Sequence, residues 1–125
     1  MMIFKEINKS EIYTNHNNCY HEDADYFDIS KNDKSLCIYG IISRDDGAGE
    51  AFWIMDSFND RVFCKNFFHS LFKHAFSLKY TKVYTWTRCE RLINVFGKFN
   101  NFGIEKTDCP KWDNDQTKTW FMRRL

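Results

Sequence analysis

The sequence has 125 residues and a formal net charge of +1, with 18 basic and 17 acidic side chains. Apolar residues make up 43% of the chain and charged residues 28%, a balance that indicates a folded domain and excludes a disordered chain. The even charge argues against general nucleic-acid binding, which requires a strongly basic surface. We expect residues 1–125 to form one domain, because a single core commonly serves about 100–150 residues.

The first half of the chain contains patterns typical of strands, with one short helix near the start. Apolar or alternating runs predict strands at residues 2–7, 26–30, 35–43 and 50–57. Residues 9–16 fit a short helix with Ser10 near its beginning. Residues 44–49 contain an Asp-Gly pair, which predicts a hairpin loop between the last two strands.

After residue 60 the apolar period changes from that of a strand to that of a helix. Residues 60–78 carry one apolar stripe: Val62, Phe63, Phe67, Phe68, Leu71, Phe72, Ala75 and Phe76. A strand at residues 82–87 and a second helix at 90–101 follow, and Gly103 is placed to close that helix. Residues 104–107 and 117–123 are expected to pair as strands across a polar loop. Helices inserted between strands in this order predict an α/β fold with a mixed sheet covered by helices.

Neither a membrane span nor a metal site is expected. No run approaches the ~18 apolar residues of a membrane helix, and residues 1–9 do not resemble a signal peptide, so we expect a soluble protein.

The cysteines are odd in number and widely spaced, which favours reduced thiols over a disulfide framework. Cys19, His21, His69 and His74 are candidate zinc ligands, but their spacing does not fit a zinc site.

The order and spacing of the elements resemble those of the GNAT superfamily, the acetyl-CoA-dependent N-acetyltransferases. The specific part lies within residues 50–105, where EAFWIMDSF, the long helix, KVYTWT and a helix ending in NNFGIEK look like the fourth strand, cofactor helix, fifth strand and final helix of that family. The resemblance implies a central, mostly antiparallel sheet of six to seven strands with helices on both faces.

The resemblance also identifies a cofactor loop, and in this chain that loop is degenerate. In GNAT enzymes it reads Gln/Arg-x-x-Gly-x-Gly/Ala, and its small residues let backbone N–H groups reach the pyrophosphate of coenzyme A. The matching residues here are Arg61, Val62, Phe63, Cys64, Lys65 and Asn66. Only Arg61 fits the pattern, so no cofactor is expected, and acetyl-CoA is the cofactor if the chain is active.

The catalytic residues of the family are also incomplete. GNAT enzymes often use a tyrosine of the final helix as general acid, whereas this helix carries Phe96 and Phe99, which have no proton to donate. If the chain is active, Glu50 and Asp56 are the candidates for a general base. The simpler interpretations are a solvated strand end for Glu50 and a capping or turn carboxylate for Asp56.

Within the superfamily, the chain most resembles a small GNAT-like internal virion protein of short-tailed bacteriophages. That resemblance implies a non-catalytic protein in the virion or in the cytoplasm of the bacterial host, acting through contacts with other virion proteins or a host protein. Two alternatives remain open. One is an active acetyltransferase with an unusual cofactor loop. The other is a phage effector that binds a host protein or nucleic acid through a basic face.

The aromatic content of 18% exceeds what a core of this size usually needs. Trp53 and Trp86 lie in mid-strand and are expected to be buried. Trp112 and Trp120 fall in the C-terminal hairpin, where exposed aromatic side chains would suit a protein interface. Together with Arg123 and Arg124 they are the candidate partner-binding residues.

Overall fold

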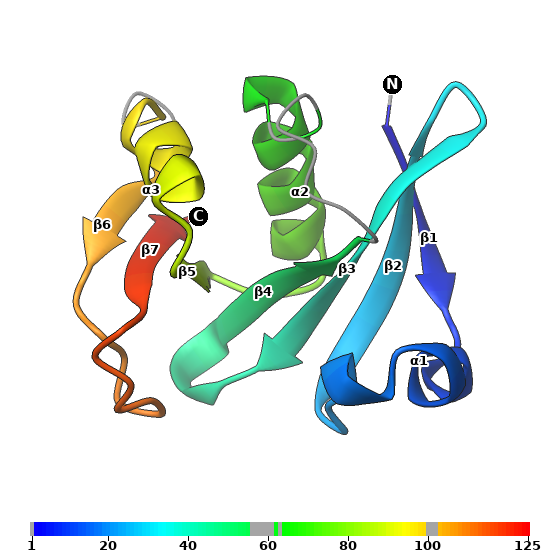
Figure 1. Ribbon diagram of the computed structural model, residues 1–125, viewed down its shortest axis with the longest axis horizontal. Helices are drawn as coiled ribbons and strands as arrows, with labels where there is room; N and C mark the ends of the chain where they lie inside the picture. Colours follow the sequence, from blue (N-terminus) through cyan, green and yellow to red (C-terminus); the bar gives the residue numbers. More distant parts are fainter. Residues whose placement is uncertain (1, 56–61, 63, 100–102) are drawn as a thin grey trace.

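A computed structural model describes residues 2–55, 62, 64–99 and 103–125 (Figure 1). Its strands are β1 (Met2–Ile7), β2 (Ala24–Lys31), β3 (Lys34–Ser43), β4 (Ala48–Ile54), β5 (Lys82–Thr87), β6 (Glu105–Thr107) and β7 (Thr119–Arg124). Its helices are α1 (Lys9–Asn15), α2 (Lys65–Ser77) and α3 (Glu90–Gly97), with 3-10 turns at Asn17–Cys19 and Asp45–Gly47. The predicted order of elements is confirmed.

The strands form one mixed sheet in the order β1-β2-β3-β4-β5-β7-β6. Among the described strands, β4 and β5 run parallel, and every other neighbouring pair is antiparallel. The fold class is therefore the predicted mostly antiparallel α/β sheet. β7 inserts between β5 and β6, so the last two strands pair as expected but in reversed spatial order.

Helices cover both faces of this sheet. On the face of α2 and α3, buried residues of β2, β3 and β5 meet the apolar stripe of α2, whose buried members are Phe67, Phe68, Leu71, Phe72 and Ala75. On the opposite face, Ile12 of α1 packs against Ala24, Tyr26 and Ile42. The stripe is therefore core, as its spacing predicts. In Figure 1, α2 and α3 lie above the sheet and α1 lies below it.

The ends of several elements depart from the sequence predictions, and β4 begins at Ala48, inside the predicted hairpin loop of residues 44–49. α2 begins at Lys65 instead of residue 60, although residues 60, 61 and 63 lie outside the described part of the chain. α3 ends at Gly97 with Lys98 as its C-cap, so the prediction that Gly103 closes this helix is wrong. Gly103 instead adopts a φ of 78° shortly before β6, a conformation that glycine accepts readily. No described helix is both long and apolar enough to span a bilayer.

Candidate functional site

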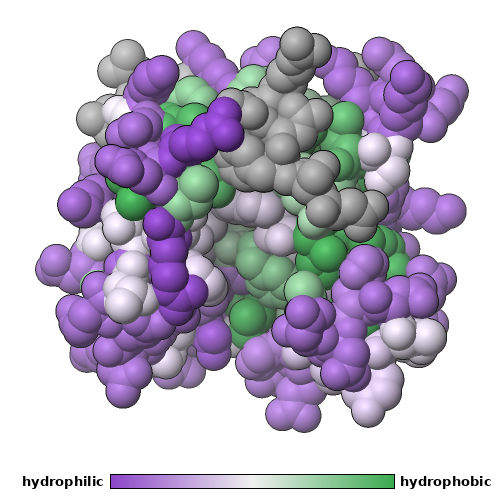
Figure 2. Space-filling view, viewed as in Figure 1, coloured by the Kyte–Doolittle hydropathy of each residue, from purple (hydrophilic) through white to green (hydrophobic). Residues whose placement is uncertain are grey.

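β4 and β5 diverge at the centre of the sheet. They pair over three residues, from Ala48 opposite Lys82 to Glu50 opposite Tyr84. Beyond Glu50 a pocket of about 200 Å³ opens between them, lined by Phe52, Trp53, Thr85, Trp86, Thr87 and Leu92. Figure 2 shows this side of the molecule hollowed near its centre, with apolar side chains beside the hollow.

Glu50 lies where the two strands separate, on the α1 face of the sheet. It is only 6% exposed. Its Oε1 accepts hydrogen bonds from Nε and Nη2 of Arg44, at 3.2 and 3.0 Å, and from the Trp112 indole N–H at 2.8 Å. Its Oε2 accepts the Trp86 indole N–H at 3.1 Å. Both oxygens of this carboxylate are therefore engaged by protein donors.

The interpretation of Glu50 as a solvated strand end is thus wrong. Strand alternation directs its side chain to the α1 face, and there the loop between β6 and β7 folds over it and places Trp112 against it. Arg44 pairs with it across the preceding turn, and the Arg44 guanidinium also lies 5.5 Å from the Trp112 ring centroid. Sequence reasoning gave no role to Arg44. The available signal was a lone arginine six residues before a carboxylate on the same hairpin.

The loop over Glu50 is held by charged pairs of its own. Lys118 donates to Asp113 at 2.5 Å, and this bond holds the pKa of Asp113 below its usual range. The Thr117 hydroxyl and backbone N–H, with help from Arg88, lower the pKa of Asp115 to about 2. Arg88 also forms an ion pair with Asp115. These bonds order the segment that carries Trp112.

The aromatic side chains around the opening are arranged differently from the expectation. Trp53 and Trp86 are half-buried, not fully buried. Trp53 lies on the α2/α3 face, 5.8 Å from Phe68 of α2 and 6.2 Å from Phe96 of α3, measured between ring centroids. Phe68 also contacts Phe96 and Phe99 directly, at 4.8 and 5.7 Å. We call Trp53, Phe68, Phe96 and Phe99 the aromatic bridge, because they join the two helices above the opening.

The predicted partner-binding residues are not assembled into one exposed patch. Trp120 is 2% exposed and packs between Tyr84 and Trp86, so its expected exposure is wrong. Arg123 is half-buried, with its guanidinium 5.7 Å from the Phe72 ring centroid. Trp112 is half-buried and bonded to Glu50, whereas Arg124 is exposed.

Other predicted site residues fall at the start of α2 or beyond the described part of the chain. Asp56, Arg61 and Phe63 lie outside the described residues. Val62 is half-buried, while Cys64, Lys65 and Asn66 are exposed, with Cys64 at the N-cap of α2. No group of three metal-ligating side chains comes together among the residues that the structure describes.

A second buried polar cluster lies on the α2/α3 face, away from the opening. The His74 ring stacks on Phe4 at 4.4 Å and meets the edge of Phe27 at 4.6 Å. Nδ1 of His74 shares a hydrogen bond with the hydroxyl of Tyr39. Burial lowers the pKa of His74 and raises that of Tyr39. The neutral forms of both side chains therefore stabilise the fold.

We expect stability to fall on acidification because of His74. A lowered pKa means that the unfolded chain binds a proton before the folded one does, so the contribution of His74 is present above about pH 6.5 and is lost as the pH falls below it. Urea unfolding of the wild type and of His74→Gln at a series of pH values measures the effect. The variant is expected to show a flatter slope. Equal slopes for the two proteins would contradict the assignment.

No model of a known protein family matches the sequence, and no curated protein is detectably similar to it in sequence. Solved structures do match. An IAA acetyltransferase from Bacillus cereus superposes with a TM-score of 0.69 at 8% identity, covering 100% of both chains. A Bacillus subtilis acetyltransferase in complex with CoA has a TM-score of 0.66 at 11% identity, covering 99% of this chain and 97% of that one. A spermidine/spermine N-acetyltransferase from Vibrio cholerae has a TM-score of 0.67 at 8% identity, covering 99% and 95%.

The chain has the GNAT fold. Within this fold, the diverging strands β4 and β5 and the helix α2, which connects them in the chain, correspond to the elements that the sequence resemblance assigns to the cofactor site. The pocket between β4 and β5, the Glu50 network below it and the aromatic bridge above it therefore form the candidate functional site.

Proposed function

We propose that this chain is a GNAT-fold protein that does not transfer acetyl groups and acts through contacts with other proteins. The observation that carries the proposal is the Glu50 carboxylate, whose two oxygens accept four hydrogen bonds from Arg44, Trp86 and Trp112. A general base needs a lone pair directed at the proton it removes. At Glu50 the chain's own donors engage both oxygens, with three hydrogen bonds at Oε1 and one at Oε2, which favours a structural role.

The aromatic bridge supports the same proposal. Coenzyme A would have to extend its thiol-bearing arm between β4 and β5, below the contact between α2 and α3. Trp53 already reaches both helices there, and the remaining space of about 200 Å³ is smaller than the ~300 Å³ at which ligand pockets usually begin. The small volume of this pocket argues against coenzyme A binding between the strands, and we assign no chemical step to it.

The setting that we propose is a short-tailed bacteriophage, either in its particle or in the cytoplasm of the infected bacterium. It rests on the sequence resemblance to the small GNAT-like internal virion protein. The partners would be other virion proteins or a host protein. An effector that binds nucleic acid is less well supported, because Arg88 is paired with Asp115 and Arg123 is half-buried against α2.

An acetyl-transfer assay tests the non-catalytic proposal. Thiol release from acetyl-CoA is followed with a panel of primary amines, for the wild type and for Glu50→Gln. We expect no release above the buffer rate in either protein. Release by the wild type that the substitution abolishes would overturn the proposal and make Glu50 a general base.

A second candidate is an active acetyltransferase, and one observation favours it. The Thr85 hydroxyl lies in the wall of the β4–β5 pocket, is buried, and has no hydrogen-bond partner among the described residues. Such a group is available to a polar ligand. In this case acetyl-CoA would be the cofactor, and Glu50 or Asp56 the base.

Thr85→Val separates the two candidates. If the pocket holds no cofactor, removing an unsatisfied buried hydroxyl is expected to leave stability unchanged or raise it by up to about 1 kcal/mol, with no effect on acetyl-CoA binding. Thermal melting with and without acetyl-CoA measures both quantities. Acetyl-CoA stabilisation that is present in the wild type and lost in Thr85→Val would favour the enzyme.

A further inference from the structure

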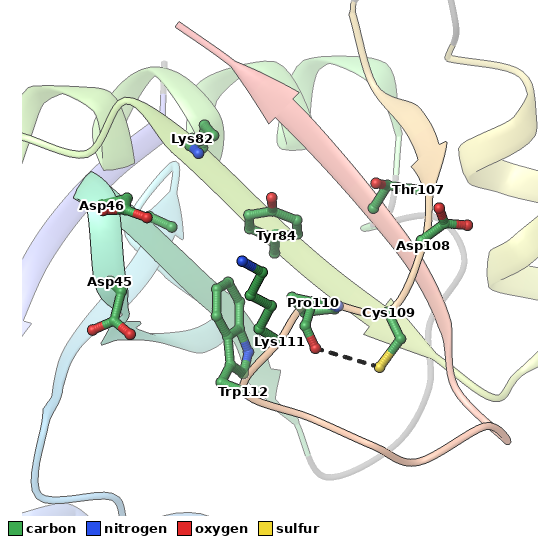
Figure 3. Close-up of a pocket in the computed structure, with 11 residues that line it drawn as sticks. Asp45, Asp46, Lys82, Tyr84, Thr107, Asp108, Cys109, Pro110, Lys111 and Trp112 are labelled. Carbon is green, nitrogen blue, oxygen red and sulfur yellow. Dashed lines mark hydrogen bonds between the residues drawn. The ribbon is translucent and has the colours of Figure 1, made fainter.

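A separate cavity of about 420 Å³ lies at the closed end of the β4–β5 pair. Its walls come from the Asp45–Gly47 turn, from the first half of β5, and from the chain between β6 and Trp112 (Figure 3). Its lining shares no residue with that of the pocket between the diverging strands. Its volume lies within the ~300–1,000 Å³ range of small-molecule sites.

Charged side chains of both signs surround this cavity. Asp45 and Asp46 lie on one side and Asp108 on the other, and the Lys111 side chain extends between them (Figure 3). Lys82 completes the rim from β5. Within the described part of the chain, none of these five charged groups forms an ion pair or a side-chain hydrogen bond. Opposite charges therefore face one cavity without neutralising one another.

Hydrogen bonds hold the backbone of the two segments that carry most of these charges. Asp46 and Gly47 adopt left-handed conformations, with φ of 60° and 75°, and the Thr81 backbone N–H donates to the Gly47 carbonyl at 2.9 Å. On the other side, the Cys109 thiol donates to the Asp113 carbonyl at 3.2 Å. A pre-organised site binds more tightly because less conformational entropy is lost on binding.

Two aromatic rings provide the apolar part of the cavity. Tyr84 and Trp112 meet edge to face, with ring centroids 5.0 Å apart and an interplanar angle of 88°. The Trp112 indole N–H is used by Glu50, so this side chain has a fixed orientation. An alkyl or aryl group can pack on such rings while charged groups are held at the rim.

The geometry points to a binding site for a small zwitterion of amino-acid or dipeptide size. Lys82 and Lys111 would hold its carboxylate, and Asp45 and Asp46 its ammonium group, while its side chain packs on the aromatic rings. A simple cation would meet two lysines and a simple anion three aspartates, so a ligand with both charges fits the rim best. This inference does not depend on the proposed function, because it involves neither acetyl-CoA nor its cleft.

Ligand screening by tryptophan fluorescence and NMR tests the inference. Free L-amino acids and the dipeptides Gly-Gly, Gly-Leu and Gly-Phe are titrated singly to about 10 mM. Titration to this concentration detects binding as weak as a millimolar dissociation constant. At least one is expected to bind saturably and to alter the tryptophan emission of the protein. Its N-acetyl and carboxamide derivatives, which each lack one charge, are expected to bind roughly tenfold more weakly.

A matched pair of lysine variants tests whether the ligand binds in this cavity. Lys111→Met is expected to raise the dissociation constant of the best ligand roughly tenfold, while Lys106→Met, at an exposed β6 position that does not line the cavity, is expected to leave it unchanged. Three results would overturn the inference: no saturable binding of any amino acid or dipeptide, equal binding of the blocked derivatives, or equal effects of the two variants. Spermidine binding as tightly as the best zwitterion would also overturn it, in favour of a cation site. All titrations omit acetyl-CoA, so failure here leaves the proposed function standing.

Discussion

Glu50→Ala is expected to lower the free energy of unfolding by about 3–5 kcal/mol, the cost of removing one partner of a buried ion pair. Three groups would lose their acceptor: the Arg44 guanidinium, whose side chain is 25% exposed, and the indole N–H groups of Trp86 and Trp112. Each is at least partly desolvated, so water replaces the carboxylate incompletely. Urea denaturation at neutral pH, followed by tryptophan fluorescence, measures the loss.

Asp45→Ala is the matched control, because Asp45 is an exposed carboxylate on the same hairpin with no ion pair in the described structure. It is expected to change stability by no more than about 0.5 kcal/mol. Glu50→Gln should fall between the two, since its amide oxygen still accepts an indole N–H but cannot pair with the guanidinium. If Glu50→Ala lowers the free energy of unfolding as little as the control does, the buried role of Glu50 is contradicted and the interpretation as a solvated strand end holds.

Phe68→Ala is expected to cost about 3–5 kcal/mol, the range for truncating a buried aromatic side chain. Phe68 is 1% exposed, and its ring lies within 6 Å of the rings of Phe67, Phe96, Phe99 and Trp53. Truncation removes the contact that joins α2 to α3 and leaves a cavity above the β4–β5 opening. The loss is measured by the same urea titration.

Phe76→Ala, a half-buried phenylalanine on the same helix, is the control for Phe68→Ala. It is expected to cost about half as much, because more of its ring is already in contact with water. Phe68→Leu, which keeps most of the volume, is expected to cost less than about 1.5 kcal/mol. If Phe68→Ala costs no more than Phe76→Ala, the aromatic bridge does not hold the two helices together.

Much of the fold could be predicted because its signals are local. β1 and β5 match their predicted ranges, since each is a short run with the apolar or alternating pattern of a strand. The stripe of α2 identifies its buried face correctly because a helix repeats its environment every three to four residues. The insertion of β7 between β5 and β6 has no local signal. The position of β7 depends on pairing with β5, a strand that is distant in the sequence.

The candidate site was predicted less well, because its contacts are distant in sequence. Glu50 reaches Trp86 and Trp112, which lie 36 and 62 residues further along the chain. Neither spacing nor composition connects a strand carboxylate with a tryptophan in a polar loop. The burial of Trp120 was missed for the same reason, since the loop that covers it folds back onto the sheet only in three dimensions.

Calorimetric titration of the purified protein with acetyl-CoA, run beside thermal melting, tests the central claim most directly. We predict no heat of binding and no rise in melting temperature up to millimolar acetyl-CoA, because the pocket between β4 and β5, which Trp53 lines, has a volume of only about 200 Å³. A ligand present at a hundredfold excess over its dissociation constant would add about 2.7 kcal/mol of stability, which is easily detected. Micromolar binding accompanied by such a shift would contradict the claim and would establish a working acetyl-CoA cleft.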